Sequence, residues 1–168
     1  MGTLAAWTFD TPTGADAAAT ALQSLVGREI LVPRDAATVS WELAWGKPRT
    51  QQLALTGPGG SLGSAFWGLL FGMVFFVPLL GAATSAAGGA LAGSLTDVGI
   101  NDNFINKVRD RVTPGTSALF VLGPDAVIDA VETAFTEHRP TGKILTSLST
   151  EQDRALRSVF AEGSAATP

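Results

Sequence analysis

The chain contains 47 consecutive residues, from Thr50 to Thr96, with no Asp, Glu, Lys or Arg, and this stretch limits how it can fold. All 26 charged residues of the 168-residue sequence lie outside the stretch. There they make up about a fifth of the residues, close to the proportion in ordinary soluble domains. That remainder is long enough to bury a core of its own. The sequence therefore predicts one small domain interrupted by an uncharged insert.

The composition leaves few residues for catalysis or for binding metals and nucleic acids. A net charge of −4 argues against a nucleic-acid partner, which would be held by a basic surface. The chain has no Cys and no Tyr, and His138 is its one histidine. Thiolate chemistry is therefore excluded, and metal sites and proton transfer have few candidate side chains. We expect a protein that is not an enzyme, with no catalytic residues, no metal site, no cofactor and no identifiable small-molecule substrate.

Strand-like and helix-like patterns alternate on both sides of the insert, which predicts an α+β fold. This succession of elements fits one sheet with helices packed against it, as in the split βαβ arrangement of ferredoxin-like folds. The order of the strands within the sheet does not follow from the sequence. The expected elements before the insert are a strand at 4–9, a helix at 14–26, a strand at 30–32 and a hairpin of strands 38–45 and 51–55. Those after it are a helix at 103–112, a strand at 117–122, a helix at 125–138, a strand at 143–148 and a helix at 151–162.

The insert consists of two unequal halves, and we place it at residues 61–96, between the two parts of the domain at 1–60 and 97–168. Eleven of the nineteen residues from Leu62 to Leu80 are Leu, Val or Phe, and this run is long enough to span a bilayer. The second half, Gly81 to Leu95, consists mostly of Ala, Gly, Ser and Thr. As a helix it would be roughly 22 Å long, short of a ~30 Å hydrocarbon core. The insert is therefore expected to be a helical hairpin whose second half packs against the first.

Small residues recur every four positions in both halves of the insert, as in a glycine zipper. This spacing lines one face of each helix with small side chains and allows another backbone to approach closely. The pattern predicts close helix contact, whether in lipid or inside an oligomer. The predicted self-association residues are Ser64, Gly68 and Gly72 in the first half and Gly81, Ser85, Gly89 and Gly93 in the second.

Several segments of the sequence together resemble one known family. They are Asp35–Val39, the Gly-rich insert with Pro78–Gly81, Leu95–Ile100 followed by Phe104, Pro114–Phe120, and Leu145–Ser149. The chain resembles the domain-of-unknown-function-1269 family of predicted bacterial membrane proteins. The resemblance implies a prokaryotic protein in which a glycine-zipper hairpin splits a ferredoxin-like domain. It implies no catalytic residue.

Two other groups of residues have ordinary structural explanations. Asp97, Asn101, Asp102 and Asn103 lack the alternating spacing of a calcium loop, and helix capping accounts for Asn101 or Asp102. Trp7, Trp41 and Trp45 are compatible with a face on which a ligand stacks, but tryptophans on a sheet more commonly pack inward.

Three functions are compatible with these features. The favoured hypothesis is a non-enzymatic, self-associating protein with its hairpin in the cytoplasmic membrane. The positive charges that flank the insert, Lys47 and Arg49 before it and Lys107, Arg109 and Arg111 after it, would then keep both termini in the cytoplasm. The alternative is a soluble cytoplasmic homo-oligomer, such as a ring or shell, in which the hairpins bury one another. A weaker alternative is a small-ligand sensor or enzyme that uses the sheet face.

If the zipper residues form an association face, Gly89→Leu should separate the helices and weaken assembly. Leu has a better intrinsic helix propensity than Gly by roughly 0.8 kcal/mol, so any loss must come from packing. Ala87→Leu, which lies off the row of small residues, is the matched control and should have a milder effect. Crosslinking in membranes and light scattering in solution measure both variants. Unchanged assembly in both would restrict the small residues to contacts within one hairpin.

Overall fold

A computed structural model describes residues 2–27, 35–44, 48–52, 70–71, 100, 102–135, 140–149 and 151 of the chain. Within these ranges it contains five strands, which form one sheet, and three helices. The strands are β1 (Gly2–Phe9), β2 (Asp35–Ser40), β3 (Arg49–Gln52), β4 (Ser117–Pro124) and β5 (Gly142–Leu148). The helices are α1 (Gly14–Gly27), α5 (Asp102–Arg111) and α6 (Asp125–Ala134). The predicted α+β class is confirmed.

The sheet is antiparallel throughout, with the strand order β3-β2-β4-β1-β5. Strands β1 and β2, which α1 connects, run parallel to each other with β4 between them. Strands β4 and β5, which α6 connects, also run parallel, with β1 between them. These are two interleaved split βαβ units, the arrangement of ferredoxin-like folds, and β3 extends the sheet beyond β2.

The two central strands are buried on both faces of the sheet, which explains why their sequences are apolar at almost every position. In β1, Leu4 and Ala6 face one core cluster, whereas Ala5, Trp7 and Phe9 face another. Strand β4 alternates in the same way, because its residues are paired with those of β1 from Gly2↔Pro124 to Phe9↔Ser117. The sheet therefore separates two hydrophobic cores.

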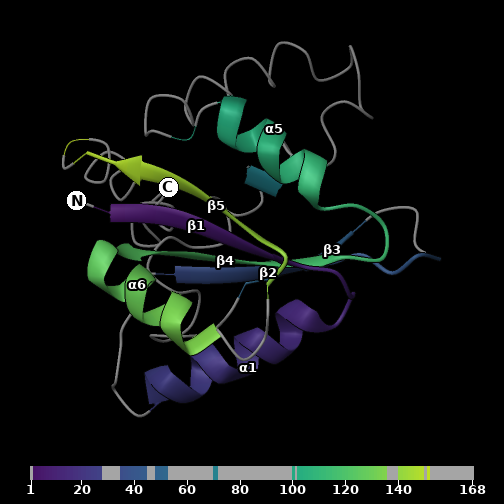
Figure 1. Ribbon diagram of the computed structural model, residues 1–168, viewed down its shortest axis with the longest axis horizontal. Helices are drawn as coiled ribbons and strands as arrows, with labels where there is room; N and C mark the ends of the chain where they lie inside the picture. The colour runs from purple at the N-terminus through teal and green to yellow at the C-terminus, as the bar shows by residue number, and fades with distance from the viewer. Residues whose placement is uncertain are drawn as a thin grey trace, which may run out of the picture.

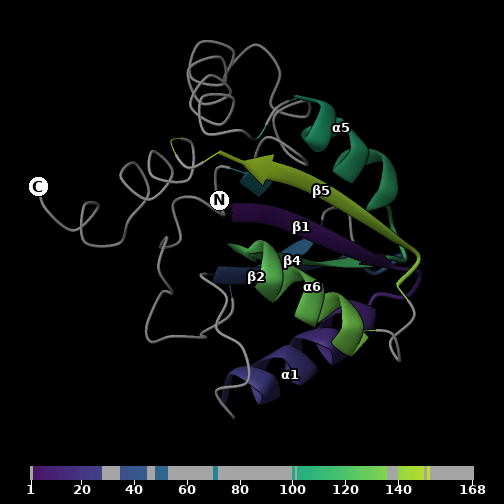
Figure 2. The same ribbon diagram turned by 60° about the vertical axis from the view of Figure 1, so that its left-hand side comes forward.

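Helices cover both sides of the sheet, so the fold has three layers (Figures 1 and 2). Helices α1 and α6 lie on one face, where small side chains of α1 such as Ala15 and Ala18 are fully buried. Helix α5 lies on the opposite face. The apolar side chains of the helix are buried there: Phe104, Ile105 and Val108, continued by Val112 just beyond the helix.

Two residues of the predicted insert are part of the core on the α5 face. Leu70 is fully buried and Phe71 is 3% exposed. The ring of Phe71 meets the ring of Phe120 on β4 edge to face, with the ring centroids 5.1 Å apart. The middle of the most apolar run in the chain therefore packs on this protein's own sheet. The rest of residues 61–96, including the predicted hairpin, lies outside the described residues.

The β2–β3 hairpin differs from the sequence prediction in its boundaries. Strand β2 begins at Asp35 and ends at Ser40, whereas the alternating pattern predicted a strand from Thr38 to Trp45. Beyond Ser40, Trp41 is held by the turn before β4: its N–H donates to the Thr116 carbonyl at 3.0 Å, and its carbonyl accepts from Gly115 N–H at 2.6 Å. The chain then turns at Leu43, which is 79% exposed. The alternation of Val39, Trp41 and Leu43 thus extends past the end of the strand.

The chain turns at Pro114–Gly115, just before β4. Gly115 has a φ of +90°, which residues with a side chain rarely adopt. Thr116 N–H donates to the Thr113 carbonyl at 3.0 Å and closes the turn. Pro followed by a Gly with positive φ is the signature of a type II turn.

We predict that Phe71→Ala destabilises the fold by roughly 3–5 kcal/mol, because it leaves a cavity against Phe120. Leu43→Ala is the control: it also truncates a large apolar side chain, but an exposed one, and should change the free energy of unfolding by less than about 0.5 kcal/mol. Urea unfolding followed by circular dichroism measures both. Equal, small effects would mean that the insert does not contribute to the core.

Candidate functional site

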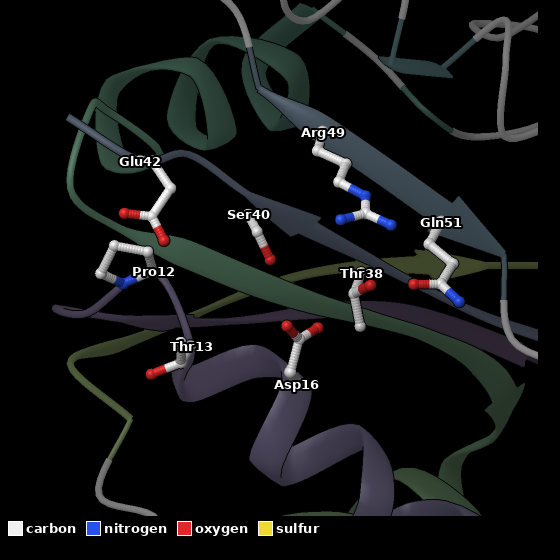
Figure 3. Close-up of a pocket in the computed structure, with 8 residues that line it drawn as sticks. All are labelled: Pro12, Thr13, Asp16, Thr38, Ser40, Glu42, Arg49 and Gln51. Atoms are coloured by element: carbon white, nitrogen blue, oxygen red, sulfur yellow. The ribbon is translucent and has the colours of Figure 1, made fainter. Parts of the chain in front are cut away.

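A polar hollow of about 380 Å³ lies beside the start of α1, on the α1 side of strands β2 and β3 (Figure 3). Three parts of the chain supply its walls: the entry and first turn of α1, strand β2 with the residues that follow it, and strand β3. The lining residues are Pro12, Thr13, Asp16, Thr38, Ser40, Glu42, Arg49 and Gln51. Apart from Pro12, every one carries a polar or charged side chain.

The pleat of the hairpin places these polar groups on one face. In β2, Ala37 and Val39 face the α5 core, so Thr38 and Ser40 face the opposite side of the sheet. The register pairs Thr38 with Gln51 and Ser40 with Arg49. Residues paired across two antiparallel strands project to the same face, so all four line the hollow. The Thr38 side chain is only 2% exposed and forms part of the floor.

A serine from the central sheet fixes the entry to α1 and, with it, the helix side of the hollow. Ser117 at the start of β4 is fully buried. Its Oγ accepts the Ala15 N–H at 2.9 Å and donates to the Thr11 carbonyl at 2.7 Å. The Ala15 N–H in the first turn of the helix is thus satisfied by a side chain that lies 102 positions away in the sequence. Asp16 lies one residue further on, in the first turn of α1.

Three charged side chains converge on the hollow: Arg49 from β3, Asp16 from α1, and Glu42 (Figure 3). Among the described residues the ion pair is that of Lys143 with Glu132, and Arg49 is joined to neither carboxylate. The site thus offers the five N–H donors of a guanidinium, two carboxylates, three hydroxyls and one amide for recognition. None of the eight lining residues is a His, Cys or Lys, and their guanidinium, carboxylates, hydroxyls and amide are groups that bind polar ligands.

A second, smaller hollow of about 250 Å³ lies between α5 and the edge of β5. Lys107, Arg111 and Lys143 line it together with Asp110. The guanidinium of Arg111 lies so close to Gly142 that a Cβ at this position would clash with it. Lys143 is also engaged by Glu132 of α6. This hollow is basic, but one of its three cations is already paired.

The residues predicted to associate through the zipper lie outside the described residues. They are Ser64, Gly68, Gly72, Gly81, Ser85, Gly89 and Gly93. Asp97, Asn101, His138 and Trp45 also lie outside them. Asp102 is the first residue of α5, and Asn103 is exposed on that helix.

Two of the three tryptophans on the predicted sheet pack inward, as expected. Trp7 is 1% exposed, and its ring meets that of Phe135 edge to face at 5.3 Å. Trp41 is partly buried against the core on the α5 face. Neither residue lines the polar hollow, so stacking on these two rings is not a feature of that site.

The sequence contains a signal for the hollow. Ser40 and Glu42 alternate with Val39 and Trp41, which pack with the α5 core, so they lie on the opposite face. Arg49 is among the positive charges that flank the insert. Polar residues alternate along both strands of the hairpin, at Thr38, Ser40 and Glu42 and then at Arg49 and Gln51. This pattern indicates a shared polar face only when the register of the hairpin is known.

Comparison with known proteins supplies a family. Residues 61–161 match the family described as "Protein of unknown function (DUF1269)", which is more than half of the chain. The chain belongs to this family. The match includes the insert, α5, β4, α6 and β5, but not β1, α1, β2 or β3. The comparisons with curated proteins and with solved structures returned no match.

We predict that Ser117→Ala destabilises the domain by about 1–2 kcal/mol, because it leaves the Ala15 N–H and the Thr11 carbonyl without their buried partner. Ser147→Ala, an exposed position on β5, should be nearly neutral. Thermal unfolding measures both, and amide exchange should show lost protection at Ala15 alone. Retained protection at Ala15 in Ser117→Ala would contradict the proposed role of Ser117.

Proposed function

We propose that this protein is a non-enzymatic, self-associating protein whose apolar insert packs against protein: its own sheet and the inserts of neighbouring copies. The α+β domain would carry the insert on its α5 face, and the product would be a cytoplasmic homo-oligomer. The observation that carries this proposal is the burial of Leu70 and Phe71 among the side chains of the sheet.

The position of these two residues in the sequence is what makes their burial informative. They lie near the middle of the apolar run Leu62–Leu80. In a helix that spans a bilayer, residues at this position lie near the centre of the hydrocarbon core and cannot contact a soluble sheet. The contact of Phe71 with Phe120 therefore supports an insert that is shielded by protein.

A membrane-inserted hairpin, with the α+β domain in the cytoplasm, is the second candidate. The 47-residue stretch without charge favours it, because ordinary soluble surfaces carry charges at far shorter intervals. Among the described residues no helix is long and apolar enough to cross a membrane. The two candidates share self-association through the small-residue rows and differ in what surrounds the insert.

Composition supports a role without catalysis. The chain has no Cys, no Tyr and one His, and these are residue types on which most nucleophilic and proton-transfer sites depend. The polar hollow is lined by carboxylates, hydroxyls, one amide and one guanidinium, and none of its eight lining residues is a His, Cys or Lys. A structural or binding role requires neither.

Alkaline carbonate extraction of membranes from cells that express the untagged chain, followed by light scattering without detergent, separates the candidates. We expect the protein to be released and to form one discrete species several times the monomer mass of 17.3 kDa. Protein that stays in the membrane pellet would instead support the inserted hairpin. A monomer in both the soluble and the detergent-extracted fractions would contradict self-association.

A further inference from the structure

We infer that the polar hollow between α1 and the β2–β3 hairpin is a binding site for a small zwitterion of the α-amino acid class. Arg49 would hold the carboxylate of the ligand, and Asp16 and Glu42 its ammonium group. This inference goes beyond the assembly proposed above and does not depend on it, because the hollow lies on the face of the sheet opposite α5, Leu70 and Phe71.

The size of the hollow fits such a ligand. Its volume of about 380 Å³ is near the lower end of the range typical of small-molecule sites, roughly 300–1,000 Å³. The floor is set by the sheet: Thr38 is almost completely buried, and Ser40 follows it on the same face. Ser117 anchors the start of α1, which carries Asp16, to β4. The walls formed by β2 and by α1 are thus held in place by the sheet.

The charges of the hollow select for a ligand that carries both signs. A simple anion would gain from Arg49 but would be repelled by two carboxylates, whereas a simple cation would gain from the carboxylates but would leave Arg49 without a partner and be repelled by it. Arg49 on β3 and Asp16 on α1 enter the hollow from different elements, with Ser40 and Thr38 between them (Figure 3). A ligand with an anionic and a cationic group on the same carbon atom would pair with both sides at once.

The other common classes of polar ligand fit less well. Quaternary ammonium groups are recognised by aromatic cages, and none of the eight lining residues is aromatic. A phosphate group would bring two negative charges next to Asp16 and Glu42, with one guanidinium to offset them. A neutral polyol would pair with the hydroxyls but would leave the three charges without partners of opposite sign.

The test uses the full-length protein and four matched probes in isothermal titration calorimetry. L-serine is the zwitterion, 3-hydroxypropionate lacks its ammonium group, ethanolamine lacks its carboxylate, and glycerol is neutral. We expect L-serine to bind with a Kd of about 1 mM or tighter, and each of the other three at least about tenfold more weakly, because each loses a charge-assisted pair. No saturable binding of L-serine at ~10 mM, or equal binding of glycerol, overturns the inference.

Substitutions in the hollow assign the two ends of the ligand. Arg49→Gln should weaken L-serine and 3-hydroxypropionate about tenfold and leave ethanolamine unchanged or bound more tightly. Asp16→Asn combined with Glu42→Gln should weaken L-serine and ethanolamine instead. Lys107→Gln, which removes an exposed charge on α5, is the control and should bind like the parent. Thermal unfolding checks that each variant folds, and binding of L-serine unaffected by Arg49→Gln in a folded protein overturns the inference.

Discussion

The burial of β1 and β4 on both faces is the constraint on which the rest of this structure depends. One face presents Trp7, Leu119 and Val121, and the other presents Leu4, Phe120 and Leu122, so both need a cover. Helices α1 and α6 supply it on one side. On the other, α5 has ten residues and is about 15 Å long, whereas the eight-residue strands extend over roughly 26 Å. Leu70, Phe71 and Ile100 add to this cover, which makes part of the uncharged insert a component of the core.

The polar hollow lies on the α1 face of the sheet, at the point where the apolar core of that face ends. Along the α1 face of β2, Ala36 is buried in the core, but the next positions on that face are Thr38 and Ser40, beside the first turn of α1. Strand β3 adds Arg49 and Gln51 opposite them. The hollow is formed by the outer strands β2 and β3 and the start of α1. The inner strands of the sheet already fix the positions of α1 and β2, so the site needs no additional structural element.

The α+β class, the helix faces and most strands could be predicted from the sequence, because the residues buried on one face of a helix or strand recur with the period of that element. The stripe of Phe104, Ile105 and Val108 is an example. The end of β2 could not be predicted. Trp41 continues the apolar alternation, but its backbone hydrogen bonds are made with the turn at 113–116 and not with a partner strand. The hollow could not be predicted either. Ser40 and Arg49 have the sequence pattern of solvated residues, and only the register of the hairpin places them opposite each other. The role of Ser117 depends on a contact between distant residues that no local pattern encodes.

The topology explains why the insert lies where it does in the sequence. Right-handed crossovers place the two helices of interleaved split βαβ units on the same face of the sheet, as α1 and α6 are here. The opposite face must then be covered by a connection that is not a crossover. The longest connection, residues 41–116, joins β2 to β4 and carries β3, the insert and α5. An apolar segment added there reaches the uncovered face without disturbing either βαβ unit. The contact of Phe71 with Phe120 is the point at which this added segment and the central strand stabilise each other.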